Sequence, residues 1–153
     1  MLTSWKSEED YDSFMHDNYF KEFKEKCNSI RFIKLETISS HGLWGDVKPF
    51  TVSRKINESN FSGNKIAVLT RGAVRISKAL NFWFSIGPAS KSISQAEGVS
   101  FYKGIGEFPL FEQATFSIWD NINYVKKFAY QDRLHFDIVK KAKEENWYKE
   151  DML

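Results

Sequence analysis

The sequence predicts an α+β fold built on an antiparallel sheet, and three observations support this prediction. Segments whose apolar residues alternate, as in β-strands, are interspersed with segments whose apolar residues recur every three or four positions, as in helices. Between residues 65 and 145 these segments follow the order strand, helix, strand, strand, helix. The two consecutive strands are separated by glycines and a proline in the stretch GIGEFPLFEQATFSIW, residues 104–119, which is typical of a hairpin.

The first third of the chain is expected to form one helix and one strand. Residues 8–28 show the apolar spacing of a helix, and Ser7 is a suitable N-cap with Asp10 three residues later. Residues 30–38, IRFIKLETI, alternate and predict a strand. Residues 39–49 are rich in serine, glycine and proline and therefore predict a loop.

The rest of the chain supplies the remaining strands and helices. Strands are expected over residues 65–71, 99–106 and 113–119, and helices over residues 77–86 and 121–145. The strand KIAVLTR is short and mostly apolar, so we expect it to be central in the sheet. The first of these helices is expected to end or kink at Gly87-Pro88, because proline lacks the N–H that a helix needs. The last helix is expected to be interrupted near Gln131-Asp132.

Two stretches share a spacing that suggests an internal duplication. Trp5 precedes Phe14 by nine residues, and Trp119 precedes Phe128 by the same number. An offset of 114 residues relates the two pairs, as expected for two copies of one structural unit.

The order of elements favours a ferredoxin-like fold. Residues 65–145 are one strand short of the βαββαβ unit. We therefore predict a tandem of ferredoxin-like units, with an incomplete first copy and its loop in residues 1–50 and the second copy in residues 65–153. Alternatively, a partner chain supplies the missing strands.

Composition excludes several classes of function. The chain has 153 residues and a net charge of +2 without a long block of one sign, which argues against nucleic-acid binding. Cys27 is the single cysteine, so neither an internal disulfide nor a CxxC motif can form. No stretch is apolar enough to span a membrane, and the N-terminus lacks the regions of a signal peptide. We expect a soluble, cytoplasmic protein, with peripheral membrane contact left open.

The glycines at 104 and 106 raise the possibility of a ligand-facing surface. A phosphate loop is excluded because a second strand follows them, without a third glycine or a helix. Both glycines lie on one face of their predicted strand with Tyr102, which leaves that face locally flat. Aromatic residues make up 16% of the chain, which fits either a small core of large side chains or a pocket for a large flat or elongated apolar ligand.

Four segments carry a family resemblance: ISSHGLWGDVKPF, AVLTRGAVR, FYKGIGEFPLFEQATFSIWDN and KKFAYQDRLHFDIVKKAKEENWYKEDML. Together they resemble the spheroidene monooxygenase family of carotenoid-biosynthesis enzymes, over nearly the whole chain and most densely from Ala67 to Leu153. The resemblance implies a tandem ferredoxin-like fold of the dimeric α+β-barrel type. It also implies O₂-dependent oxygenation of an acyclic carotenoid, heme as the cofactor and a homodimer as a candidate assembly. This chain is expected to be shorter than the family at both ends.

The resemblance also implies a heme site. His135 matches the histidine that follows the FAY segment, and it would be the axial ligand of the iron. On the residues alone it could equally be a histidine at the edge of the core, bonded to a backbone carbonyl. Gly104 and Gly106 would give the porphyrin a flat face to lie against.

Three further residues are candidates beside such a heme. Arg71, at the end of the strand KIAVLTR, would pair with a propionate or polarise the oxygen substrate, or it could be a solvated strand terminus. Arg75 would be a second propionate partner or simply the start of a helix. His41 would shape the mouth of the pocket or donate a proton, or it could be an exposed turn residue.

Other polar residues are given structural roles. Glu107 and Glu112 flank the predicted hairpin and are interpreted as exposed turn residues, in preference to an acid/base pair. His16 is expected on the surface. Two functions therefore remain open: a carotenoid monooxygenase, and a non-catalytic α+β-barrel protein that binds heme or another apolar ligand. A third possibility is an inactive piece of the enzyme.

Overall fold

The computed structural model describes residues 2–52, 63–108 and 111–152. It describes the backbone alone for six residues within these ranges: Ile86, Ala89, Glu107, Phe108, Leu134 and His135. The chain divides into two compact units, one that ends at Glu36 and one that begins at Thr37.

The second unit is a complete βαββαβ ferredoxin-like unit. Its elements are β1 (Ile66–Val74), the short 3₁₀ helix η2 (Ile76–Lys78), α3 (Ala79–Ser94), β2 (Val99–Phe108), β3 (Glu112–Trp119), α4 (Ile122–Gln131), α5 (Arg133–Glu144) and β4 (Tyr148–Met152). The strands form one antiparallel sheet in the order β2-β3-β1-β4, so β1 is central. The predicted α+β class, the β2–β3 hairpin and the interruption of the last helix are confirmed.

The prediction that this unit lacks its last strand is wrong, because β4 pairs along the edge of β1. Arg71 lies opposite Met152, and Ala73 lies opposite Glu150. The sequence YKEDM has apolar residues only at its two ends, so it carries no strong strand signal of its own. Its conformation comes from the free edge that β1 offers it.

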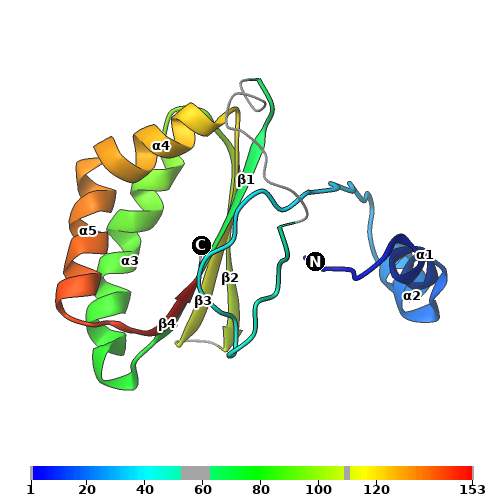
Figure 1. Ribbon diagram of the computed structural model, residues 1–153, viewed down its shortest axis with the longest axis horizontal. Coiled ribbons are helices and arrows are strands. Elements are labelled where there is room, and N and C mark those ends of the chain that lie inside the picture. The colour runs from blue at the N-terminus through cyan, green and yellow to red at the C-terminus, as the bar shows by residue number, and fades with distance from the viewer. Residues whose placement is uncertain (1, 53–62, 109–110, 153) are drawn as a thin grey trace. The chain divides into compact units, whose positions relative to one another are not determined.

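One face of the sheet is covered by the three helices of this unit (Figure 1). Val74 of β1 packs there with Phe82 of α3, Ala142 of α5 and Trp147 in a buried cluster. Trp119 of β3 lies on the same face, where its ring centroid is 5.2 Å from that of Phe128 in α4. Large aromatic side chains thus supply much of the apolar burial that holds the helices on the sheet.

The opposite face of the sheet, which we call the open face, carries the side chains of alternate residues. It comprises Ala67, Leu69, Arg71 and Ala73 of β1, Phe101, Lys103 and Ile105 of β2, Glu112, Ala114, Phe116 and Ile118 of β3, and Glu150 and Met152 of β4. The segment from Thr37 to Val52 runs along this side of the sheet (Figure 1). Phe101 and Ile105 remain 49% and 39% exposed, so the open face is an apolar surface that this segment covers only in part.

Helix α3 continues through Gly87-Pro88, so the expectation that it ends there is wrong, and the alternative of a kink stays a prediction. Proline removes one hydrogen bond of the helix and favours a bend. Here both residues are exposed, so the freed carbonyl group can bond to water. The helix contacts α5 and β2, and these tertiary contacts override the local preference.

The first unit is helical and aromatic. The predicted single helix is two helices, α1 (Glu8–His16) and α2 (Asn18–Glu25). Ser7 caps α1 as predicted by accepting a hydrogen bond from Asp10 N–H. Asp17 has an extended backbone and caps α2 by accepting from Tyr19 N–H at 2.7 Å, and this separates the two helices.

The strand predicted over residues 30–38 is not formed, because these residues adopt neither helix nor strand. A strand needs a neighbour, and the described part of this unit offers only helices. Trp5 nevertheless contacts Phe14 at 4.9 Å, the same pairing of rings that Trp119 and Phe128 make. The division into a partial first copy and a second copy stays a prediction.

In the described residues, no helix combines the length and the apolarity that crossing a bilayer would require.

Candidate functional site

Arg71 lies on the open face and is almost completely buried. Its side chain is 4% exposed, and its guanidinium is 2.5 Å from a carboxylate oxygen of Glu150 and 3.5 Å from one of Glu112. The guanidinium carbon also lies 5.1 Å from the centre of the Trp44 ring, in a cation–π arrangement. The alternative of a solvated strand terminus is therefore wrong, and Arg71 joins three strands and the loop that precedes β1.

Glu150 connects Arg71 to the backbone of that loop. One carboxylate oxygen accepts a hydrogen bond from Gly45 N–H at 2.8 Å, and the other accepts from Asp46 N–H at 3.3 Å. The Gly45 N–H, followed by the Asp46 N–H and the Arg71 charge, lowers the pKa of Glu150 below its usual value. Glu150 is therefore ionised near neutral pH.

Residues His41–Val47 form a tight turn, which we call the 41–47 turn. Trp44 and Val47 pair as a short antiparallel bridge with hydrogen bonds in both directions. Gly45 and Asp46 between them both have positive φ, 60° and 66°, as a type I′ turn requires.

Gly42 attaches the turn to β4. It forms an antiparallel bridge with Met152. Its φ is 82°, and a Cβ at this position would lie 2.1 Å from the carbonyl oxygen of Asp151. Only glycine permits so close an approach of the two backbones.

His41 lies at the start of the turn and is exposed. Its Nε2 is 3.1 Å from the hydroxyl oxygen of Ser39, which fixes the ring locally. Gly42, next to His41 in the chain, bridges Met152, and Met152 pairs with Arg71. The structure therefore brings His41 to the part of the sheet that holds Arg71.

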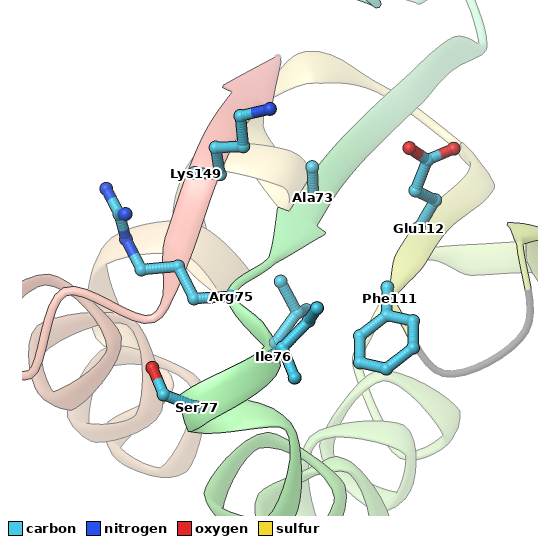
Figure 2. A pocket seen from close by; sticks show the side chains of 8 residues that line it. Ala73, Arg75, Ile76, Ser77, Phe111, Glu112 and Lys149 are labelled. Atoms are coloured by element: carbon cyan, nitrogen blue, oxygen red, sulfur yellow. The ribbon is translucent and has the colours of Figure 1, made fainter.

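Arg75 follows β1 and lines a shallow pocket of about 390 Å³ at the end of the sheet. Its Nε donates to the carbonyl oxygen of Tyr148 at 3.1 Å. In Figure 2 the guanidinium of Arg75 extends away from the gap between Ile76 and Phe111; Lys149 lies on the side of Arg75, and Glu112 lies on the side of Phe111. Arg75 thus adjoins β4 at Tyr148, whereas the 41–47 turn contacts the same strand at Glu150 and Met152.

Gly104 and Gly106 face the helix-covered side of the sheet. Gly104 lies opposite Thr115 and Gly106 opposite Gln113, whereas Ile105 between them lies opposite Ala114 on the open face. A Cβ built on Gly104 would meet nothing within 4 Å, whereas one on Gly106 would lie 3.4 Å from the side-chain amide of Gln113. The flat ligand-facing surface stays a prediction. Both glycines are on the opposite side of the sheet from Arg71, and one flat ligand cannot contact both sides within this chain.

His135 belongs to α5, and its side chain lies outside the described part of the structure. Its predicted role as an iron ligand therefore stays a prediction. His16 is exposed as expected, and its Nδ1 is 2.8 Å from the carbonyl oxygen of Asp12 in the same helix. Among the described residues no group of three or more histidine, cysteine, aspartate and glutamate side chains is placed to hold a metal ion.

Those of the proposed heme-binding residues whose side chains the structure describes do not surround one cavity. Arg71 faces the open side, the two glycines face the helix side, and Arg75 lies at the end of the sheet. Sequence reasoning missed Trp44 and Glu150, which complete the environment of Arg71. The Gly-Asp pair at positions 45 and 46 signals a tight turn, but nothing local indicates that the turn meets β4.

In comparisons with known proteins, the chain is similar to spheroidene monooxygenases over most of its length. The spheroidene monooxygenase of Rhodobacter capsulatus is 32% identical over 133 residues, which are 87% of this chain and 54% of that protein. The spheroidene monooxygenase of Cereibacter sphaeroides is 32% identical over 121 residues, 78% of this chain and 36% of that protein. The chain thus spans about half of the length of the first relative and less of the second. No protein-family model matches the sequence.

Solved structures share the fold. Rv0793 from Mycobacterium tuberculosis superposes with a TM-score of 0.52 at 10% identity, covering 59% of this chain and 91% of that chain. A protein from Fusobacterium nucleatum with a provisional monooxygenase name gives a TM-score of 0.54 at 12% identity, covering 97% of this chain and 64% of that one. At such identities the likeness establishes the fold alone, and it agrees with the predicted ferredoxin-like α+β class.

Proposed function

Because this chain belongs to the spheroidene monooxygenase family, we propose that it carries out O₂-dependent oxygenation of an acyclic carotenoid. The observation behind this proposal is the 32% identity with the Rhodobacter capsulatus enzyme. The match extends over 133 residues, more than the second unit contains, so part of the helical first unit is included. The ferredoxin-like fold, which a protein with a provisional monooxygenase name shares, is consistent with this proposal.

The apolar open face suits an apolar partner. The rings of Phe101 and Phe116 pack there in an edge-on arrangement, with their centroids 6.3 Å apart, and Ile105 is also exposed on this face. Such a surface fits a polyene substrate, and it fits equally the matching face of a second copy in a homodimer. Phe101→Asp distinguishes the two occupants. Sizing by light scattering shows whether a dimer dissociates, and polyene titration shows whether substrate binding is lost.

Heme enters the proposal through the family resemblance, with His135 as the donor to the iron. When bound, heme would supply the activation of O₂, and the chain would supply the imidazole nitrogen and exclude water. The arrangement of Arg71, Arg75 and the two glycines does not add support, since these residues lie on different sides of the sheet.

The test is reconstitution with heme followed by absorption spectroscopy and turnover. The proposal predicts a Soret band that His135→Ala abolishes and His16→Ala leaves unchanged, because His16 is bonded within its own helix. It also predicts incorporation of one atom of ¹⁸O₂ into a carotenoid product. A Soret band without any product would favour the non-catalytic heme-binding alternative. A spectrum unchanged in His135→Ala would remove His135 as ligand.

Peripheral membrane contact is a separate proposal, motivated by the apolar substrate. It is tested by flotation with zwitterionic and with anionic vesicles. Recovery of the protein in the soluble fraction with both compositions would exclude such contact.

A further inference from the structure

We propose that Arg71 is a positioning residue, whose guanidinium fixes the 41–47 turn, and with it His41 and Trp44, against the open face. In this role Arg71 acts on the site through the turn and does not present its charge to a ligand. The role is independent of the identity of the substrate and of the presence of heme.

The first argument is the set of groups that already engage the guanidinium. Glu150 and Glu112 place two carboxylates beside one cation, and the cluster therefore carries a net negative charge. An anionic ligand such as a propionate would have to displace Glu150, which two backbone N–H groups of the turn also hold. The buried Arg71 cation is therefore paired with groups of the protein itself and is not available to an anionic ligand.

The second argument is the connection from Arg71 to the turn. Glu150 binds the guanidinium and the N–H groups of Gly45 and Asp46 with the same carboxylate. The ring of Trp44, from the same turn, also lies over the guanidinium. The turn is therefore attached to Arg71 in two ways, at Gly45 and Asp46 through a carboxylate and at Trp44 through a ring.

The third argument is that the strands of the sheet are held together without the Arg71 side chain, whereas the turn is attached to that side chain. Strand β1 pairs with β3 over eight consecutive residue pairs and with β4 through its own backbone hydrogen bonds. These ladders do not depend on the Arg71 side chain. Weakening Arg71 should therefore release the turn before it disturbs the strands.

Amide hydrogen exchange resolved by residue tests this proposal on the protein as it is. Arg71→Lys keeps the charge but loses the planar group that lies against Trp44 and reaches both carboxylates. We expect exchange of the Gly45 and Asp46 amides to accelerate about ten-fold or more, with amides of the β2–β3 ladder changed less than about two-fold. Lys127→Met is the matched control, because it removes an exposed pair with Glu97 on the helical side and should leave the turn unaffected.

Trp44→Ala provides the second arm. It should accelerate the same two amides, and the double variant with Arg71→Lys should show little further change, since both substitutions disrupt one support. Additive effects, or exchange that rises equally in β1, β4 and the turn, would overturn the proposal in favour of a general stabilising role. Unchanged exchange at Gly45 and Asp46 in Arg71→Lys would also overturn it.

Activity supplies a further readout, which rests on the proposed function. If Arg71 acts through the turn, Arg71→Lys and Trp44→Ala should change kcat/KM by similar factors. A large loss in Arg71→Lys with normal activity in Trp44→Ala would show that the charge itself acts on the substrate. Absence of wild-type turnover would count against the proposed function alone, because the exchange experiment still decides the role of Arg71.

Discussion

Replacing either of two glycines of the sheet by alanine should change the stability of the protein in opposite directions, although both glycines have ordinary strand conformations. At Gly104 an added Cβ would meet nothing within 4 Å. At Gly72 it would lie 2.6 Å and 2.8 Å from two ring atoms of Tyr148, a side chain that packs against the buried cluster. The two variants therefore differ in space and not in backbone strain.

The magnitudes follow from this difference. Replacing glycine by alanine within a strand reduces the entropy lost on folding, so Gly104→Ala should stabilise the protein by about 0.5–1 kcal/mol. Gly72→Ala gains the same term, but it forces the Tyr148 ring out of its place, at about 1–3 kcal/mol for overpacking. The net effect at Gly72 should be a destabilisation of up to about 2 kcal/mol.

Urea unfolding followed by near-ultraviolet circular dichroism measures both variants. With a denaturant slope of about 2 kcal/mol per molar, the midpoints should differ by roughly 1 M, with Gly104→Ala the higher. A midpoint for Gly104→Ala at or below that of Gly72→Ala would refute the reasoning, because it would mean that the space beside Gly104 is filled. Gly104→Ala also tests the predicted ligand-facing surface. If a flat ligand lies against Gly104, this variant should bind the ligand more weakly than the wild type.

Three further predictions concern the core, a helix cap and pH. Trp147 is 1% exposed, so Trp147→Ala should lower the free energy of unfolding by about 3–5 kcal/mol, and Trp147→Phe by clearly less, in thermal or chemical denaturation. Asn121 caps α4 by accepting from the N–H groups of Asn123 and Tyr124, so Asn121→Ala should cost about 1 kcal/mol, whereas Asn121→Asp should retain most of the stability. The pKa of Glu150 is lowered in the folded protein, so its contribution is complete above its ordinary pKa of 4.5 and is lost as the pH falls through the lower folded value. The stability difference between wild type and Glu150→Gln should therefore shrink on acidification, and a difference that grows would contradict this assignment.

Elements defined by local sequence were predictable. The β2–β3 hairpin follows from two alternating runs around a glycine- and proline-containing connection, and the Ser7 cap follows from a polar residue directly before a helical pattern. The strand β4 was not predictable, because Tyr148–Met152 pairs only where β1 leaves an open edge. The segment 30–38 shows the converse, since a strong alternation forms no strand without a neighbour.

The environment of Arg71 was beyond sequence reasoning for a similar reason. Its partners Trp44 and Glu150 lie 27 residues before it and 79 residues after it in the chain. They meet only because β4 completes the sheet and Gly42 brings the turn against it. An arginine that the sequence predicts at a strand end near an apolar surface resembles a ligand-binding group until those contacts are known.

The arrangement of the candidates on two faces of the sheet makes the site itself testable. A flat ligand on the helix-covered face would contact Gly104 and would be unaffected by the 41–47 turn, whereas a ligand on the open face would contact the turn and be indifferent to Gly104. Gly104→Ala and Trp44→Ala therefore report on different faces with one binding measurement each. Weakened binding in Gly104→Ala alone would assign the ligand to the helix side, where α5 carries His135. Weakened binding in Trp44→Ala alone would assign it to the open face, and a heme bound there would need a donor other than His135.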